Sequence, residues 1–155
     1  MQKSIGLALR PTSITIVEVT GGVTDGLASY CKDDPTCEKT LIVLRAGEWT
    51  QLRQFPQSYV LGSQLDTREF CEIVKIHFDN RRREVEERIY SQFDELIKTH
   101  WDAVIAVVTA LSDSPWLPAE PSDHVAGKRK KRLDGATLVT ILGKFGILAK
   151  VRETP

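Results

Sequence analysis

The chain has 155 residues, of which 41% are hydrophobic and 27% are charged, and its formal net charge at pH 7 is zero. This length and composition are typical of a globular protein that can bury a core, and one domain over residues 1–155 is expected. The longest apolar run, Ala103–Val108, is far shorter than the roughly 20 residues that a membrane-spanning helix needs, so a membrane protein is excluded.

The first part of the chain is predicted to form strands. Ser4–Leu9 has the composition of a buried strand, and Ile14–Val19 alternates and is rich in β-branched residues. Because the link between them is short, the two are expected to form a β-hairpin. Thr40–Leu44 is predicted to be a third strand. No motif in Leu27–Lys39 predicts a role for that segment.

Two helical segments are predicted next. Asp66 and Glu69 have the spacing of a capping box, and apolar residues follow at helical spacing up to about Phe78. Val74–Phe78 also alternates in the manner of a strand, so this segment has two interpretations. A second apolar stripe predicts a helix over Glu84–Thr99. Asp79–Arg81 either separates two helices or lies within one long helix that runs to about His100.

The C-terminal third is predicted to contain a strand, a long loop, a helix and a last strand. Ala103–Val108 is expected to be a central strand that is buried on both faces. Residues 112–132 are predicted to be a loop that is first proline-rich and then basic. Asp134 is a candidate cap for a helix over Leu133–Phe145, and Ile147–Val151 is the predicted final strand.

This order of elements defines an α/β fold with a mixed sheet: a β-hairpin plus a third strand, then helix–strand–helix–strand. The order resembles the RNase H-like fold superfamily of nucleases, resolvases and actin-like ATPases. In that fold three antiparallel strands come first, and helices then alternate with parallel strands. It is similar in particular to small members of the superfamily that have a basic loop before the last helix and strand. The resemblance lies in topology alone.

The resemblance implies where catalytic carboxylates would stand. Nucleases of this superfamily carry an Asp on the first strand and further carboxylates around two Mg²⁺ ions, because hard oxygen ligands must clamp the metals. Ser4–Leu9 contains no carboxylate. Glu18, Asp113 and Asp134 are the remaining candidates, and each also fits a surface, turn or cap position. We therefore expect a non-catalytic member without a cofactor; a divergent nuclease that uses Mg²⁺ or Mn²⁺ is the alternative.

The charges of the chain are unevenly distributed. From Pro121 onward there are eight Lys and Arg against three Asp and Glu, whereas the preceding residues carry 13 against 18. Five of these basic residues are consecutive: Lys128, Arg129, Lys130, Lys131 and Arg132. Such a run is typical of phosphate binding, and a nuclear-import signal or a solvated loop are the alternatives. A second cluster, Arg81–Arg83, is followed at once by glutamates and indicates an ion-paired helix face.

These observations predict a binding protein. We expect a non-catalytic domain that uses the basic run to contact a nucleic acid or a nucleoprotein complex. A protein–protein adaptor is a further alternative, and its candidate anchors are aromatic: Trp49, Phe55, Tyr59 and Trp116. Three cysteines, and an N-terminus without an apolar signal region, favour the cytoplasm, or the nucleus if the source is eukaryotic.

Overall fold

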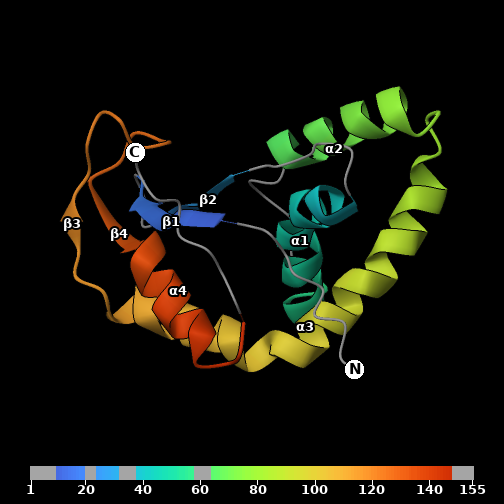
Figure 1. Ribbon diagram of the computed structural model, residues 1–155. Helices are drawn as coiled ribbons and strands as arrows, with labels where there is room; N and C mark the ends of the chain where they lie inside the picture. The colour runs from blue at the N-terminus through green and yellow to red at the C-terminus, as the bar shows by residue number, and fades with distance from the viewer. Residues whose placement is uncertain (1–9, 20–23, 32–37, 58–63, 148–155) are drawn as a thin grey trace. The chain divides into compact units, whose positions relative to one another are not determined.

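The computed structural model describes residues 10–19, 24–31, 38–57 and 64–147. The fold is mixed α/β and combines helices with a small antiparallel sheet (Figure 1). Where one domain is expected over residues 1–155, the chain packs into two compact units. The sheet unit comprises Met1–Asp33 with His100–Pro155, and the helical unit comprises Asp34–Thr99.

Eight helices and strands occur in the described part of the chain. In chain order they are β1 (Arg10–Glu18), β2 (Thr24–Cys31), α1 (Glu38–Gln54), α2 (Gln64–His77), α3 (Arg82–Asp113), β3 (Leu117–Pro118), β4 (Arg129–Asp134) and α4 (Gly135–Gly143). Helix α3 changes direction at His100, where the backbone is not helical (φ −114°, ψ 19°). His100 is also where the chain passes from the helical unit to the sheet unit.

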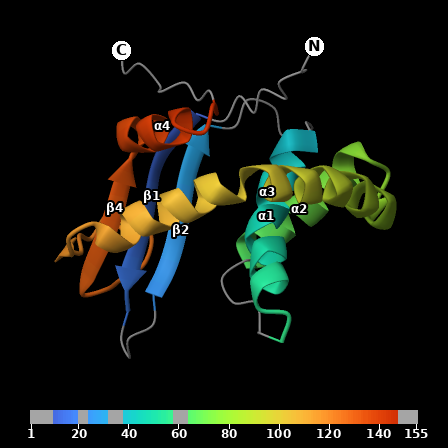
Figure 2. The ribbon, with the colours of Figure 1, turned by 90° about the horizontal axis from the view of Figure 1, so that it is seen from below.

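The sheet unit is built around β1. Its strand order is β2-β1-β4-β3, and each neighbouring pair is antiparallel. In the described residues, α4 and the C-terminal half of α3 lie on the same face of the sheet (Figure 2). Among the residues of this unit whose side chains are described, the buried apolar ones are Val17, Ala103, Leu133 and Leu138. The sheet therefore has one helix-covered face, while the loop between β3 and β4 contributes to a pocket beside β1 and β4.

The helical unit packs α1, α2 and the first half of α3 around an apolar core. Nine buried residues form this core: Leu41, Ile42, Leu44, Phe70, Ile73, Val74, Val85, Ile89 and Phe93. Each helix contributes residues three or four positions apart, which is the spacing that places side chains on one helix face. Asp79 and Asn80 adopt positive φ angles (52° and 59°) and end α2, so α2 and α3 are two separate helices.

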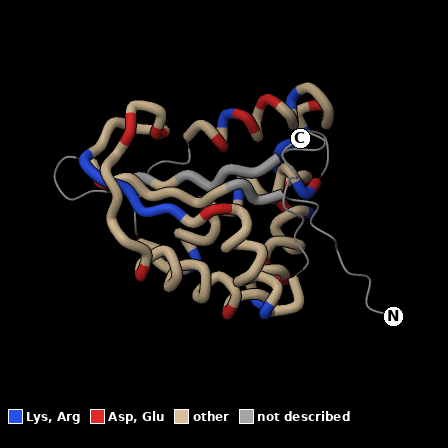
Figure 3. The backbone as a smooth tube through the Cα atoms, turned by 60° about the vertical axis from the view of Figure 1, so that its left-hand side comes forward, with Lys and Arg blue, Asp and Glu red and all other residues tan. Residues whose placement is uncertain are grey.

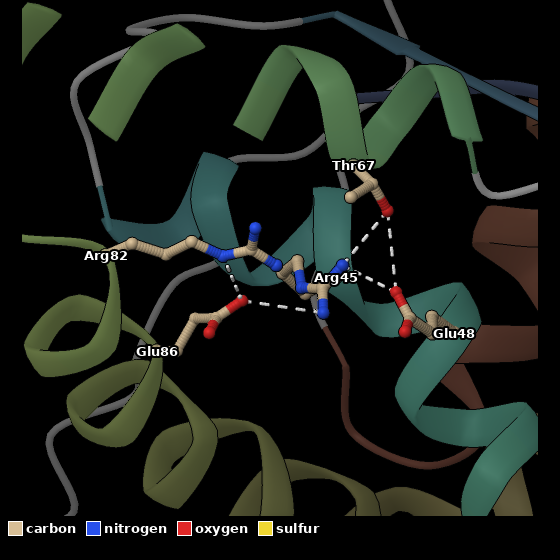
Figure 4. Close-up of polar contacts among 5 residues, drawn as sticks. All are labelled: Arg45, Glu48, Thr67, Arg82 and Glu86. Atoms are coloured by element: carbon tan, nitrogen blue, oxygen red, sulfur yellow. Dashed lines mark hydrogen bonds and ion pairs between the residues drawn. The ribbon is translucent and has the colours of Figure 1, made fainter. Parts of the chain in front are cut away.

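A buried arginine ties these three helices together. The guanidinium group of Arg45 on α1 bonds to Glu48 Oε2 at 2.5 Å and to Thr67 Oγ1 on α2 at 3.0 Å, and it lies 3.5 Å from Glu86 Oε1 on α3 (Figure 4). Its guanidinium carbon is 5.4 Å from the ring centres of both Trp49 and Phe70. Ion pairing and ring contacts thus compensate a charge that is taken from water.

Two predicted strands are helices, and those predictions are wrong. Thr40–Leu44 lies in α1, where Leu41 and Leu44 point into the core with Phe70. Ala103–Val108 continues α3, and within it only Ala103 is buried. Short apolar runs fit a strand or a helix equally well on periodicity alone, and here tertiary packing and the preceding helical turns select the helix.

Other elements match the sequence. The strand predicted at Ile14–Val19 is confirmed up to Glu18, where β1 ends, and the described hairpin partner of β1 is β2. The predicted strand Ser4–Leu9 lies outside the described residues. The helices predicted from Asp66 and over Glu84–Thr99 are confirmed by α2 and α3. The helix after Asp134 is confirmed by α4. The α/β class is therefore correct. Of the predicted order helix–strand–helix–strand, the first strand was placed wrongly at Ala103–Val108.

The described sheet contains antiparallel neighbours alone, whereas the RNase H-like arrangement adds parallel strands. The predicted last strand lies outside the described residues except for Ile147. The relationship to the RNase H-like superfamily stays a prediction.

Candidate functional site

The basic run Lys128–Arg132 enters a strand at Arg129, so the prediction that residues 112–132 form a loop is wrong for Arg129–Arg132. Arg129 to Arg132 belong to β4 and pair with Glu18 to Thr15 of β1, while the Lys128 amide donates to the Glu18 carbonyl at 2.9 Å. Figure 3 shows this basic segment within the sheet unit. Because side chains alternate along a strand, Lys130 and Arg132 share one face and Arg129 and Lys131 share the other.

Lys130 points into the protein. It is only 6% exposed, and its ammonium group lies 2.9 Å from Glu120 Oε2 and 2.8 Å from Asp123 Oδ1. Both carboxylates come from the loop between β3 and β4. The Glu120 backbone amide donates to Asp123 Oδ2 at 2.6 Å; this bond and the Lys130 ammonium lower the pKa of Asp123. In turn, Asp123 and Glu120 raise the pKa of Lys130, so its charge is compensated inside the unit.

Two other members of the run contact Trp116. The guanidinium carbon of Arg129 lies 4.2 Å from the centre of the Trp116 ring, and the Lys131 ammonium lies 5.1 Å from it. Arg129 also donates through Nε to Glu18 Oε2, while Lys131 donates to the Ser112 carbonyl. Trp116 is therefore partly covered by cations, and its role as a protein-binding anchor stays a prediction.

Lys128 and Arg132 are the least engaged of the five. Both side chains are exposed, and neither forms an ion pair within the part of the chain whose side chains the structure describes. Arg132 borders a polar pocket of about 160 Å³, which the hydroxyl groups of Ser13, Thr15 and Ser122 also line. The outward positive charge of the run therefore comes from Lys128 and Arg132, together with the half-exposed Arg129.

The candidate catalytic carboxylates lie apart. Glu18 and Asp134 stand at opposite ends of the β1–β4 ladder, since Glu18 pairs with Arg129 and Asp134 pairs with Ser13. Five strand residues span about 17 Å, and a two-metal site needs its ions only ~4 Å apart. Asp113 is the last residue of α3. Within the described ranges, no group of three or more His, Cys, Asp and Glu residues is placed to hold a metal ion.

Asp134 has a structural role instead. Its Oδ1 accepts the Thr137 backbone amide at 2.7 Å, which caps α4 and lowers the pKa of the Asp134 carboxyl. A carboxylate at this position also interacts favourably with the positive end of the helix dipole. The cap interpretation of Asp134 is confirmed.

The remaining predicted sites lie in the helical unit. Trp49 packs edge-on against Tyr90 at 5.0 Å and next to Phe93 at 5.3 Å, so it is a packing residue rather than an exposed anchor. Phe55 is 65% exposed. Tyr59 lies outside the described residues. The ion-paired helix face predicted at Arg81–Arg83 is confirmed, because each arginine pairs with a glutamate of α3.

Sequence reasoning missed the partners of the basic run. Glu120 and Asp123 look like solvated loop carboxylates, and only the register of β4 places the Lys130 side chain between them. It also missed Arg45, because a strand that ends at Leu44 does not predict that the next residue, an arginine, is buried. The acidic residues that precede the basic run are the one local signal in the sequence that indicated neutralisation of positive charge within the run.

No family model, curated protein or solved structure matches this chain. No described helix combines the length and the apolar composition needed to cross a membrane.

Proposed function

We propose that this protein binds nucleic acid without catalysing a reaction on it, and that Lys128, Arg129 and Arg132 contact the phosphates. The single observation that carries this proposal is the exposure of these three cations within five consecutive residues, with Lys128 just before β4 and with Arg129 and Arg132 on opposite faces of β4. Phosphate contacts of this kind supply affinity and orientation but no direct sequence information.

The geometry of the segment suits a polyanion. An extended chain from residue 128 to residue 132 spans about 13 Å, which is the axial rise of about four nucleotides of one strand. β1 holds the segment in this extended conformation through the β1–β4 ladder and through the Lys128 amide. Less ordering entropy is then lost on binding than a flexible basic loop would lose.

Lys130 is not part of the proposed interface. Its ammonium group lies between Glu120 and Asp123, and these two carboxylates compensate its charge and repel a phosphate. Lys131 is half-buried and donates to the Ser112 carbonyl. The interface therefore has three contacting cations rather than five.

The test is fluorescence-anisotropy titration of labelled single- and double-stranded DNA and RNA at low and at moderate salt. The interface variant replaces Lys128, Arg129 and Arg132 with Gln. The matched control replaces Arg68, Lys75 and Arg83 with Gln, three exposed cations of the helical unit, so both variants lose the same charge. We expect salt-sensitive binding that the interface variant loses and the control keeps. Equal loss in both variants would show nonspecific attraction, and no binding by the wild type would remove the proposal.

A further inference from the structure

The guanidinium plane of Arg129 is fixed in two directions. The Trp116 ring lies against it, with 4.2 Å from the guanidinium carbon to the ring centre. Its Nε donates to Glu18 Oε2, which fixes one edge of the plane. Two contacts of this kind restrict the rotamers of an arginine, whereas a free surface arginine samples many rotamers.

This fixed plane stays accessible. The Arg129 side chain is 48% exposed although it contacts both Trp116 and Glu18. A guanidinium group has five N–H donors, and the bond to Glu18 occupies only Nε, so the four Nη hydrogens remain for a ligand. Arg129 thus offers a planar, charged surface next to a set of directed donors.

A planar cation of this kind recognises unpaired nucleobases. Bases that are released from a duplex stack on aromatic rings and on arginine planes, and the adjacent Nη groups can bond to a base edge or to a phosphate. In a duplex the base faces are covered by neighbouring bases, so the same surface would contact the backbone alone. Trp116 supports the plane from behind, and Lys131 next to the same ring helps to fix that support.

We infer that the ligand of this surface is a single-stranded nucleic acid, with one base stacked on the Trp116–Arg129 pair. The inference rests on the proposed function, since it names the class of nucleic acid bound at the same strand. Lys128, the exposed residue next to Arg129, then holds a flanking phosphate. DNA and RNA share the stacking chemistry, and the test includes both.

The experiment compares three labelled probes at one salt concentration: a single strand with bases, an abasic strand of equal length and a duplex. The key variant is Arg129→Lys, which keeps the charge but removes the plane, and the control is Arg132→Lys. We expect wild type to bind the single strand about tenfold more tightly than the abasic strand. Arg129→Lys should lose about that factor on the base-containing strand and less than about twofold on the abasic strand. Arg132→Lys should leave the ratio between the two unchanged.

A second variant protects the test against a folding artefact. Trp116→Leu removes the support of the plane, and its circular-dichroism melt shows whether the sheet unit is still folded. If folded, it should lose the preference for bases in the same way as Arg129→Lys. Equal affinity for abasic and base-containing strands, or a preference for duplex, would overturn the inference and leave the proposed function standing. Absence of binding to all three probes would overturn both.

Discussion

The ammonium group of Lys130 lies 2.8 Å from Asp123 Oδ1, and the two side chains are 7% and 9% exposed. The pair holds the loop between β3 and β4 against the sheet from the middle of the basic run. A cluster of five cations on neighbouring positions repels itself, and the pair reduces that repulsion by neutralising its central member. The same contact decides which cations stay available to a ligand.

We expect Lys130→Met to lower the melting temperature more than Glu120→Gln does. The first change leaves the Asp123 carboxylate enclosed without its cation, whereas Glu120 is 64% exposed and can be hydrated. The measurement is thermal unfolding followed by circular dichroism. The double variant Lys130→Met with Asp123→Leu should recover part of the loss, because no enclosed charge is then left unpaired. Equal effects of the two single variants would contradict the structural role of the pair.

The acid dependence of stability should change at Asp134. Its carboxyl has a lowered pKa in the folded protein because it accepts the Thr137 backbone amide. A lowered folded pKa contributes stability that is fully present above the ordinary Asp pKa and is lost as the pH falls through the lowered value. Asn accepts the same bond without titrating. Asp134→Asn should therefore match wild type at neutral pH and lose less stability than wild type in urea unfolding at acid pH. Parallel acid profiles would contradict this role.

Gly127 lies where a side chain cannot fit. A Cβ atom at this position would stand 2.7 Å from the Glu18 carbonyl oxygen and even closer to the Val17 side chain. Backbone cannot move aside as a flexible side chain can, so Gly127→Ala should reduce the free energy of unfolding by about 1–3 kcal/mol. The matched control is Gly47→Ala on α1, where nothing lies within 4 Å; it should stabilise the protein by about 0.5–1 kcal/mol. The measurement is urea unfolding of both variants. A Gly127→Ala variant that is as stable as wild type would contradict the close approach of Gly127 to the Glu18 carbonyl.

The sequence was sufficient where one local signal dominates. The cap at Asp134, the β-branched alternation of Ile14–Val19 and the ion-paired Arg81–Arg83 face are each set by residues within a few positions, and all three are confirmed. Propensity failed at Thr40–Leu44 because burial against α2 and α3 outweighs the weak strand preference of β-branched residues.

The chemistry of the basic run depends on long-range pairing and was therefore harder to predict. Five consecutive cations suggest five phosphate contacts, but the register of β4 on β1 turns Lys130 inward and sets Arg129 beside Glu18. A one-residue shift in that register would exchange the two faces of the strand. No local pattern in the sequence fixes this register. The sequence therefore located the basic run but did not show which of its cations are exposed and available to a ligand.

Arg45 should be the most sensitive charged residue of the helical unit. Arg45→Met removes the cation that Glu48 and Glu86 share. Glu86 still pairs with Arg82, and the two carboxylates are only 23% and 27% exposed. We expect a loss of about 2–3 kcal/mol in the free energy of unfolding, with partial hydration of the carboxylates limiting the cost. The control is Arg83→Met, whose side chain is 92% exposed and pairs with Glu87. It should change stability by about 0.5 kcal/mol or less. Equal losses in the two variants would contradict a buried network.

The salt dependence of binding counts the phosphate contacts. If Lys128, Arg129 and Arg132 each neutralise one phosphate of a single strand, the slope of log K against log salt is about −2; five contacts would give about −3.5. Arg132→Gln should make the slope shallower by about 0.7. Lys130→Gln should leave it unchanged in protein that is still folded, because Asp123 and Glu120 already neutralise Lys130. A wild-type slope near −3.5 that falls on removal of Lys130 would place Lys130 on the ligand and contradict its assignment to the interior.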